Sequence, residues 1–136
     1  MSQTERIGEI LSLKHFAVVG ASRSSDKYGY KVYKALKQAG YTVFPVNPNA
    51  DTVDGDTCYP SLDNISAQID CVVTITPPVI TENAVHLAGL LRVPYVWMQP
   101  GSESVSAVHA AHAAGIQDVS DGSCILVALT TKKHNV

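Results

Sequence analysis

The chain has 136 residues, which is the length of one ordinary domain and enough for a sizeable core. Hydrophobic residues make up 46% and charged residues 16%, a balance that excludes intrinsic disorder. With 10 basic and 12 acidic residues the formal charge is −2, so duplex DNA or RNA is not an expected partner.

Three further features of the sequence bear on the cellular compartment of the protein. No apolar run approaches the roughly 18 residues that a membrane helix needs, and the N-terminal segment lacks the apolar core of a signal peptide. The three cysteines form no CxxC pair and leave one unpaired, which favours a reduced, cytoplasmic setting. Because no linker or repeat interrupts the pattern, we expect one domain over residues 1–136 that binds neither nucleic acid nor membrane.

Short apolar strands and amphipathic helices alternate along the chain. In order, the apolar spacing predicts helix 2–13, strand 16–19, helix 28–39, strand 41–46, strand 71–76, helix 81–91, strand 95–98, helix 103–114 and strand 116–119. The segment Cys124–Leu129 fits a strand or a helix equally well. The first helix opens with Ser2 and Glu5 at capping-box spacing. Pro45 cannot donate to a ladder, so it predicts an unpaired edge or a bulge in the second strand.

This alternation predicts right-handed βαβ crossovers and a parallel sheet that is covered on both faces. We therefore expect an α/β fold, a single Rossmann-like three-layer α/β/α domain with about five parallel strands. In such sheets ligands bind beyond the carboxyl ends of the strands. The segments at these ends hold no histidine, and they are 20–27, 47–49, 76–79, 99–102 and 120–124.

The first of these segments predicts a phosphate site. Gly20 supplies the first glycine of a dinucleotide fingerprint, while Ser22 and Ser25 stand where the other two glycines belong. Free N–H groups at the start of the next helix bind phosphate. The cations Arg23 and Lys27 oppose the helix dipole there, which makes physical sense if an anion occupies that end. An ordinary Ser-rich loop that caps the helix is the alternative interpretation.

The end of the second strand argues against NAD. Dinucleotide-binding domains usually place Asp or Glu there to accept the ribose hydroxyls. This chain has Asn47 followed by Pro48, and the nearest acid is Asp51. An Asn side chain donates as well as accepts, so a ribose phosphate or an adenine edge is one partner for it. Turn formation by Asn-Pro-Asn is the other interpretation.

Several short motifs occur in a fixed order along the chain. They are Val-Val-Gly-Ala-Ser-Arg at 18–23, Pro-Val-Asn-Pro-Asn at 45–49, Tyr-Pro-Ser-Leu at 59–62 and Trp-Met-Gln-Pro-Gly at 97–101. Together they resemble the small stand-alone CoA-binding protein family, over about residues 14–127. Those proteins are similar to the CoA-binding domain of succinyl-CoA synthetase alpha subunits, and most have no assigned reaction.

The resemblance implies a site for coenzyme A (CoA) or an acyl-CoA that holds the nucleotide part of the ligand. The implied contacts are Gly20, Ala21, Ser22 and Arg23 for the pyrophosphate, Asn47 and Pro48 for the adenosine 3′-phosphate region, and Thr76, Pro77 and Pro78 for the adenine and ribose. Lys27 joins this set through the charge argument above.

The remaining candidates have less specific interpretations. Cys124 lies on a sheet-end segment, but nucleophilic catalysis needs a base and these segments hold no histidine, so we interpret it as an inert packed thiol. His109 and His112 lack further ligands at matching spacing, so we expect solvated histidines and no metal. We interpret Lys31, Lys34 and Lys37 as cations of a solvated helix face.

The leading interpretation is a module that binds CoA or acyl-CoA through its nucleotide part, with no catalytic residue. The first alternative is an NAD(P)-binding regulatory or redox domain. The absence of the second and third fingerprint glycines and of the strand-end acid argues against it. The second alternative is an acyl-CoA-processing enzyme that uses Cys124, for which no base is visible.

Overall fold

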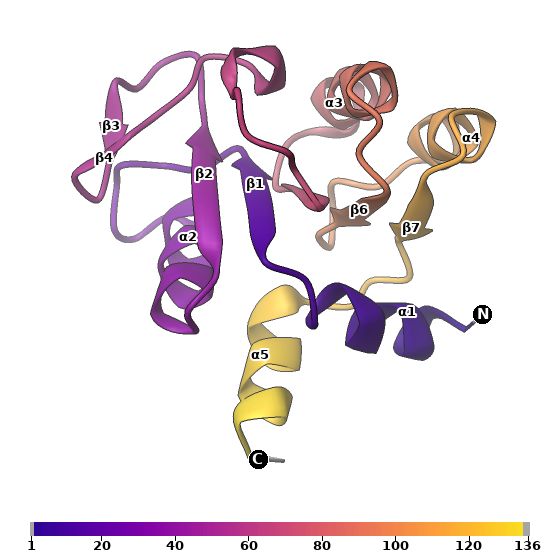
Figure 1. Cartoon of the computed structure of the whole chain (residues 1–136), viewed down its shortest axis with the longest axis horizontal. Helices are drawn as coiled ribbons and strands as arrows, with labels where there is room; N and C mark the ends of the chain where they lie inside the picture. Colours follow the sequence, from indigo (N-terminus) through magenta and orange to yellow (C-terminus); the bar gives the residue numbers. More distant parts are fainter. Residues whose placement is uncertain (1, 135–136) are drawn as a thin grey trace.

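The computed structural model describes residues 2–134. Its elements are α1 (Gln3–Ile10), β1 (His15–Val19), α2 (Tyr28–Gln38), β2 (Thr42–Val46), β3 (Thr52–Val53), β4 (Asp56–Thr57), η1 (Leu62–Asn64), β5 (Cys71–Thr74), α3 (Pro78–Leu90), β6 (Tyr95–Met98), α4 (Val105–Ala113), β7 (Gln117–Val119) and α5 (Ile125–His134). Five parallel strands form one sheet in the order β2-β1-β5-β6-β7 (Figure 1). The predicted three-layer Rossmann-like fold is confirmed.

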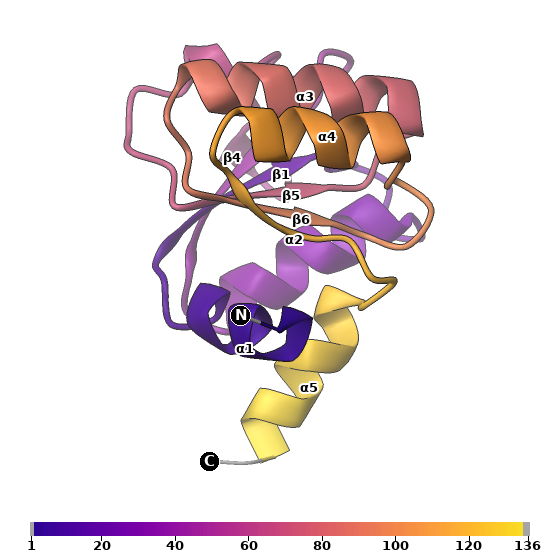
Figure 2. The ribbon, with the colours of Figure 1, turned by 90° about the vertical axis from the view of Figure 1, so that its right-hand side faces the viewer.

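Helices cover both faces of the sheet. Figure 2 shows α3 and α4 above it, with α1, α2 and α5 below. The helices α2, α3 and α4 connect β1 to β2, β5 to β6 and β6 to β7, whereas the hairpin of β3 and β4 and the short η1 connect β2 to β5. All neighbouring strands of the five-stranded sheet run parallel. The carboxyl ends of all five strands therefore meet at one edge of the sheet, and this edge is where the loops of interest gather.

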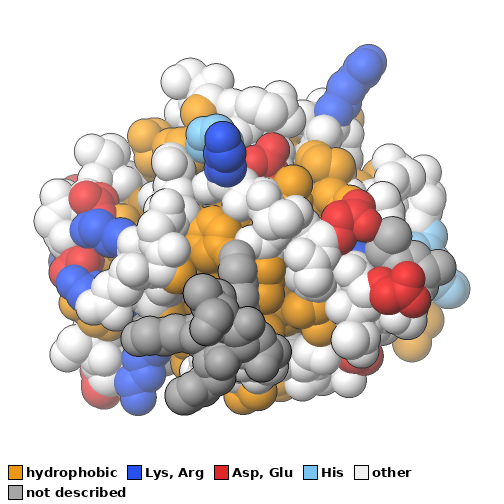
Figure 3. Space-filling view, turned by 60° about the horizontal axis from the view of Figure 1, so that its bottom comes forward, with side chains coloured by type: hydrophobic (Ala, Val, Ile, Leu, Met, Phe, Trp, Pro, Cys, Tyr) orange, Lys and Arg blue, Asp and Glu red, His pale blue; other side chains and the backbone are white. Residues whose placement is uncertain are grey.

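The segment after Cys124 forms the helix α5, which resolves the open choice between strand and helix. Its first residue, Ile125, is fully buried, whereas Val127 is 65% exposed. Hydrophobic side chains reach the surface on the face that carries α1 and α5 (Figure 3). None of the described helices has the length and apolar character of a membrane span.

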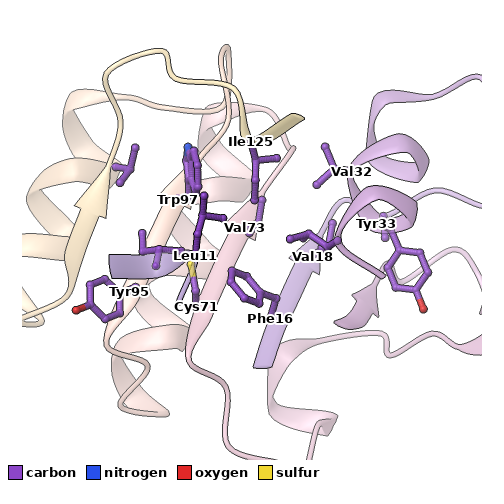
Figure 4. Close-up of a cluster of buried hydrophobic side chains, with 14 of the residues drawn as sticks. Leu11, Phe16, Val18, Val32, Tyr33, Cys71, Val73, Tyr95, Trp97 and Ile125 are labelled. Atoms are coloured by element: carbon purple, nitrogen blue, oxygen red, sulfur yellow. The ribbon is translucent and has the colours of Figure 1, made fainter. Parts of the chain in front are cut away.

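The core lies on both sides of the sheet because successive strand residues point to opposite faces. Phe16 and Val18 of β1 pack toward α2 and α5 together with Trp97 of β6 (Figure 4). Ala17 and Val72 belong to a second cluster under α3 and α4. Strands β5 and β6 are buried along their whole length, which explains their nearly unbroken apolar sequences.

Pro45 lies in an edge strand, as the sequence predicts. It pairs in register with Val18 of the neighbouring strand β1. The carbonyl oxygen of Pro45 accepts a hydrogen bond from the Tyr59 N–H at 2.9 Å, on the side away from β1. The proline nitrogen faces the same outer side, where the ladder of the sheet needs no donor.

Two helix boundaries differ from the prediction by three residues, and the others by at most two. Helix α1 ends at Ile10 instead of residue 13, although Ser2 is the N-cap and accepts from the Glu5 N–H at 3.1 Å, as predicted. Helix α3 begins at Pro78, before the predicted start at Thr81, with Pro77 as its N-cap. Proline is favoured in the first helical position because no hydrogen-bond donor is needed there.

A short hairpin of β3 and β4 adds a feature that the apolar pattern does not predict. Lys34 of α2 lies 2.8 Å from Asp54, and Lys37 lies 2.6 Å from Asp56. The hydrogen bond from Lys34 is the largest cause that lowers the pKa of Asp54, to about 2. The interpretation of these lysines as merely solvated is therefore wrong, because they fasten α2 to the hairpin.

The N-terminal helix is held against the other edge strand, β7. The side chains of Gln3 and Arg6 donate to the Asp118 carbonyl oxygen at 3.0 and 2.6 Å, and the Ser120 N–H donates to the Gln3 amide oxygen at 2.9 Å. His112 Nε2 lies 2.8 Å from the carboxylate of the buried Asp118. The side chain of His112 is exposed, as expected of a solvated histidine, and it also contacts Asp118.

Candidate functional site

The carboxyl end of β1 turns sharply at Gly20. This residue has a φ of +97°, and a Cβ atom there would lie 2.7 Å from the carbonyl oxygen of Ile75. Its N–H donates to the carbonyl oxygen of Val46, the last residue of β2, at 3.0 Å. Glycine is required here on both conformational and steric grounds. The turn brings the ends of β1, β2 and β5 together, as a phosphate-binding turn requires.

A second glycine, Gly29, allows α2 to pack closely against this turn. The site residues predicted from the sequence do not include it. A Cβ atom on Gly29 would overlap the carbonyl oxygen of Gly20. In dinucleotide fingerprints the third glycine allows the same close packing of helix and strand. Here the glycine stands farther along the chain than position 25, because the loop before α2 is longer. A glycine in the first turn of an amphipathic helix was the available signal.

Asn47 fixes the loop in place from the end of β2. Its amide nitrogen Nδ2 donates to the carbonyl oxygen of Ala21 at 2.8 Å, and its oxygen Oδ1 accepts from the Asn49 N–H at 2.8 Å. The side chain of Ala21 is fully buried in the core. Asn47 therefore acts as a turn former and also ties β2 to the loop after β1.

The residue that precedes α2 is exposed and carries a positive charge. This residue is Lys27, the N-cap of the helix, and no side chain in the described part of the chain caps the first N–H groups of α2. Arg23 and Lys27 are exposed and form no ion pair with any of residues 2–134. The Ser22 hydroxyl accepts from the Ser24 N–H at 3.1 Å, which leaves its own proton available. Free amide groups, a hydroxyl and two cations together suit an anion.

A pocket of about 410 Å³ opens beside this loop, on the face of the sheet that α3 covers. The described residues that line it include no charged side chain; they are Val19, Gly20, Val46, Asn47, Pro48, Asn49, Pro60, Ser61, Leu62, Thr76, Ile80, Asn83, Ala84 and Leu87. The pocket thus combines apolar walls with the amides of three asparagines. This composition suits a flat, neutral ring with hydrogen-bonding edges.

The predicted site residues divide into three groups by position. Gly20, Asn47, Pro48 and Thr76 line the pocket. Ser22, Arg23 and Lys27 lie in the neighbouring loop, and the side chain of Ala21 is buried beneath it. Pro77 and Pro78 are exposed at the start of α3 and do not line the pocket, because the helix begins earlier than predicted.

Cys124 lies at a different part of the same sheet edge. It directly precedes α5, and its sulfur lies 2.8 Å from the hydroxyl oxygen of Tyr28, the first residue of α2. Within the described residues, no three His, Cys, Asp or Glu side chains gather as ligands for a metal ion.

Comparison with known proteins adds a family to this geometry. The sequence model of the CoA binding domain matches residues 14–130. The uncharacterized protein YneT of Bacillus subtilis is 33% identical over 134 residues, which are 93% of this chain and 94% of that protein. A hypothetical protein from Pyrococcus horikoshii OT3 has a TM-score of 0.87 at 34% identity, over 93% of this chain and 88% of that one.

Larger enzymes contain a similar segment. An ADP-forming acetate–CoA ligase of Methanocaldococcus jannaschii is 32% identical over 76 residues, which are 56% of this chain and 11% of the ligase. The match to such a ligase therefore spans about one tenth of the length of the enzyme.

Proposed function

The chain belongs to the CoA binding domain family, and from this premise we propose that it binds coenzyme A or acyl-CoA through the nucleotide part without catalysing a reaction. The observation that carries the proposal is the division of the sheet edge into an uncharged pocket and a cationic helix start. The nucleotide of CoA has the same division, because it joins a neutral adenine ring to negatively charged phosphates.

We assign the adenine to the pocket between β2 and α3. Its volume of about 410 Å³ falls within the range of small-molecule sites. Val46 and Ile80 offer apolar contact to the ring faces, while Asn83 and Ser61 offer an amide and a hydroxyl to its edges. Thr76 lines the pocket just beyond the end of β5, and we assign it to the adenine and ribose.

We assign the pyrophosphate to the loop between Gly20 and α2. The uncapped N–H groups of α2 and the hydroxyl of Ser22 are its donors, and Arg23 supplies a charge-assisted contact. Lys27, at the N-cap, adds a second positive charge. Asn47 and Pro48 border the region of the 3′-phosphate, and Asn47 contributes mainly by holding the loop through Ala21.

One observation favours the alternative of an NAD(P)-binding domain. Gly29 supplies the close helix packing that is typical of dinucleotide sites, so the argument from a missing third glycine no longer holds. The strand-end residue still argues against NAD(P). Asn47 occupies the place of the ribose-binding acid, and its amide nitrogen and oxygen both form hydrogen bonds within the protein. NAD and NADPH are therefore needed as competing ligands in the test.

A thermal-shift panel of CoA, acetyl-CoA, NAD and NADPH tests the proposal. CoA and acetyl-CoA should stabilise the protein equally, because the assigned contacts all lie at the nucleotide end. Ligand at about 100 times its dissociation constant should add roughly 2.7 kcal/mol to the free energy of unfolding. Stabilisation by NADPH with none by CoA would reverse the assignment.

Ser22→Asp tests the phosphate site directly. The new carboxylate would stand in the loop before α2, where it can still accept from the Ser24 N–H but repels phosphate. We expect an intact melting transition and no stabilisation by CoA. Ser106→Asp is the matched control, because Ser106 is exposed in the first turn of α4 and lies outside the proposed site. If both variants bind CoA alike, the loop is only a helix cap.

A further inference from the structure

The first residues of α2 and α5 meet above the end of β6 in a small polar cluster. The Tyr28 hydroxyl donates to the amide oxygen of Gln99 at 3.0 Å and lies 2.8 Å from the sulfur of Cys124. The N–H of Ile125 donates to the same Gln99 oxygen at 2.8 Å. We call Tyr28, Gln99 and Cys124 the thiol cluster.

Gln99 carries an unused donor in this cluster. Its side chain is fully buried, and its Nε2 has no hydrogen-bond partner in the described part of the chain. Buried amide donors are almost always paired, so an unpaired one needs a specific reason. Because the oxygen of the same amide bonds to Tyr28 and Ile125, the amide lies where the two helix starts converge. An incoming carbonyl oxygen is the acceptor that would pair it.

Cys124 differs from the other two cysteines in its surroundings. Cys71 is fully buried in β5, and burial is the largest cause that raises the pKa of its thiol. Burial also raises the pKa of the Cys58 thiol. Such buried thiols are unreactive. Cys124 is partly exposed and directly precedes α5, at the helix end that favours negative charge.

The Tyr28 hydroxyl keeps its proton next to this sulfur. Burial first, and then the hydrogen bond with Cys124, raises the pKa of Tyr28 above its ordinary range. Tyr28 therefore serves as a hydrogen-bond donor and not as a base. When Cys124 ionises, the hydroxyl can turn from Gln99 to the sulfur anion, while the Ile125 N–H continues to pair the Gln99 oxygen.

We propose that the thiol cluster receives the sulfur end of CoA and that Cys124 forms a reversible mixed disulfide with it. The inference rests on the proposed CoA binding. Tyr28 is the first residue of the helix to which the pyrophosphate is assigned, and its side chain contacts Cys124. The pantetheine arm that extends from the pyrophosphate thus starts beside the cluster, and its amide carbonyls are acceptors of the kind that Gln99 Nε2 lacks.

The co-reactant is the disulfide of CoA, and the step is thiol–disulfide exchange. Cys124 loses its proton to water, and the thiolate attacks one sulfur of the CoA disulfide. A bond forms between Cys124 Sγ and that sulfur while the original S–S bond breaks. The second CoA leaves as a thiolate that carries the electron pair, so the Cys124 sulfur is oxidised and the departing CoA sulfur is reduced.

Intact mass and peptide mapping after incubation with CoA disulfide test this inference. We expect one CoA adduct, on Cys124, that a reductant removes and that Cys124→Ser lacks. Glutathione disulfide is the matched reagent without a nucleotide, and it should react at least about tenfold more slowly because it has no binding site that brings it to Cys124. Ser22→Asp should lower the CoA disulfide rate to that of glutathione disulfide. Tyr28→Phe should slow the reaction about tenfold, since it removes a hydrogen bond to the anion.

The outcomes separate this inference from the proposed function. Thermal stabilisation by reduced CoA without any adduct overturns the inference and leaves CoA binding in place. Equal rates with both disulfides, or an adduct on Cys58 or Cys71, also overturn it. Absence of both stabilisation and adduct overturns the inference and the proposed function together.

Discussion

Gly29 packs directly against the peptide group of Gly20, with no room for a side chain between them. The contact fixes the start of α2 on the end of β1 through backbone atoms alone. The free N–H groups of the helix are therefore held at a set position over the sheet edge. Two glycines nine positions apart in the chain act as one structural unit.

Gly29→Ala should destabilise the protein by about 1–3 kcal/mol or more, because the added methyl group must push α2 away from β1. CoA should also stabilise this variant less, since the N–H groups move with the helix. Denaturant unfolding with and without CoA measures both effects. Gly8→Ala in α1 is the control, because no atom lies within 4 Å of the new methyl group. It should gain about 0.5–1 kcal/mol, and an equal loss in both variants would contradict the packing argument.

Asn83→Phe should fill the pocket beside α3 and weaken CoA binding by at least about tenfold, or roughly 1.4 kcal/mol. Asn83 is exposed, so the fold has no reason to change. Isothermal titration with CoA gives the affinity. His86→Phe places the same ring on the exposed surface of the same helix, outside the pocket lining, and should bind CoA as the parent does. Equal CoA affinities of the two variants would contradict the assignment of the adenine to this pocket.

Asn47→Asp should cost about 1–3 kcal/mol of stability, because it replaces the donor to the Ala21 carbonyl by an acceptor. The same change creates the strand-end acid that NAD sites use. CoA affinity should fall with the loosened loop. Asn64→Asp, at an exposed position of η1, should change stability by less than about 0.5 kcal/mol. Thermal melts of both variants with CoA and with NAD provide the comparison, and a stable Asn47→Asp would mean that the Ala21 bond is dispensable.

Stability should fall as the pH drops from about 4 toward 2. The folded-state pKa of Asp54 is lowered to about 2, mainly by the hydrogen bond from Lys34, so its contribution is complete above the unfolded value near 4 and is lost through the folded value. Asp54→Asn tolerates the positive φ of 52° and removes the charge. Its melting temperature should depend less on pH in this range than that of the parent. If the melting temperatures of the variant and the parent fall equally with pH, other carboxyl groups cause the loss of stability in acid.

The sheet and most helices could be predicted because local sequence determines them. The central strand β6 is an uninterrupted apolar run, and β5 is apolar up to its last residue, Thr74, as burial on both faces demands. Gly20 was identifiable for the same reason, since a sharp turn after a buried strand requires glycine. The proposal that the loop after β1 binds phosphate rests on the charge of the loop and on its place at the sheet edge.

The missed features depend on tertiary contacts, which the local apolar pattern does not show. The importance of Gly29 comes from how closely α2 approaches Gly20, which no apolar period reveals. The hairpin of β3 and β4 has two-residue strands and is held by side chains of α2. The contact between Cys124 and Tyr28 joins residues that lie 96 positions apart in the sequence.

The backbone groups on the outer sides of the edge strands β2 and β7 are largely occupied, which limits how copies of this protein can associate. At β2, the outward-facing Pro45 and its bond with Tyr59 leave little backbone for a further strand. At β7, the side chains of Gln3 and Arg6 occupy the Asp118 carbonyl, and the Ser120 N–H is already paired with Gln3. Both borders are thus protected against strand addition, the usual route to edge-to-edge aggregation. Removal of α1 would expose the outer backbone groups of β7 and allow a strand of another molecule to pair with them.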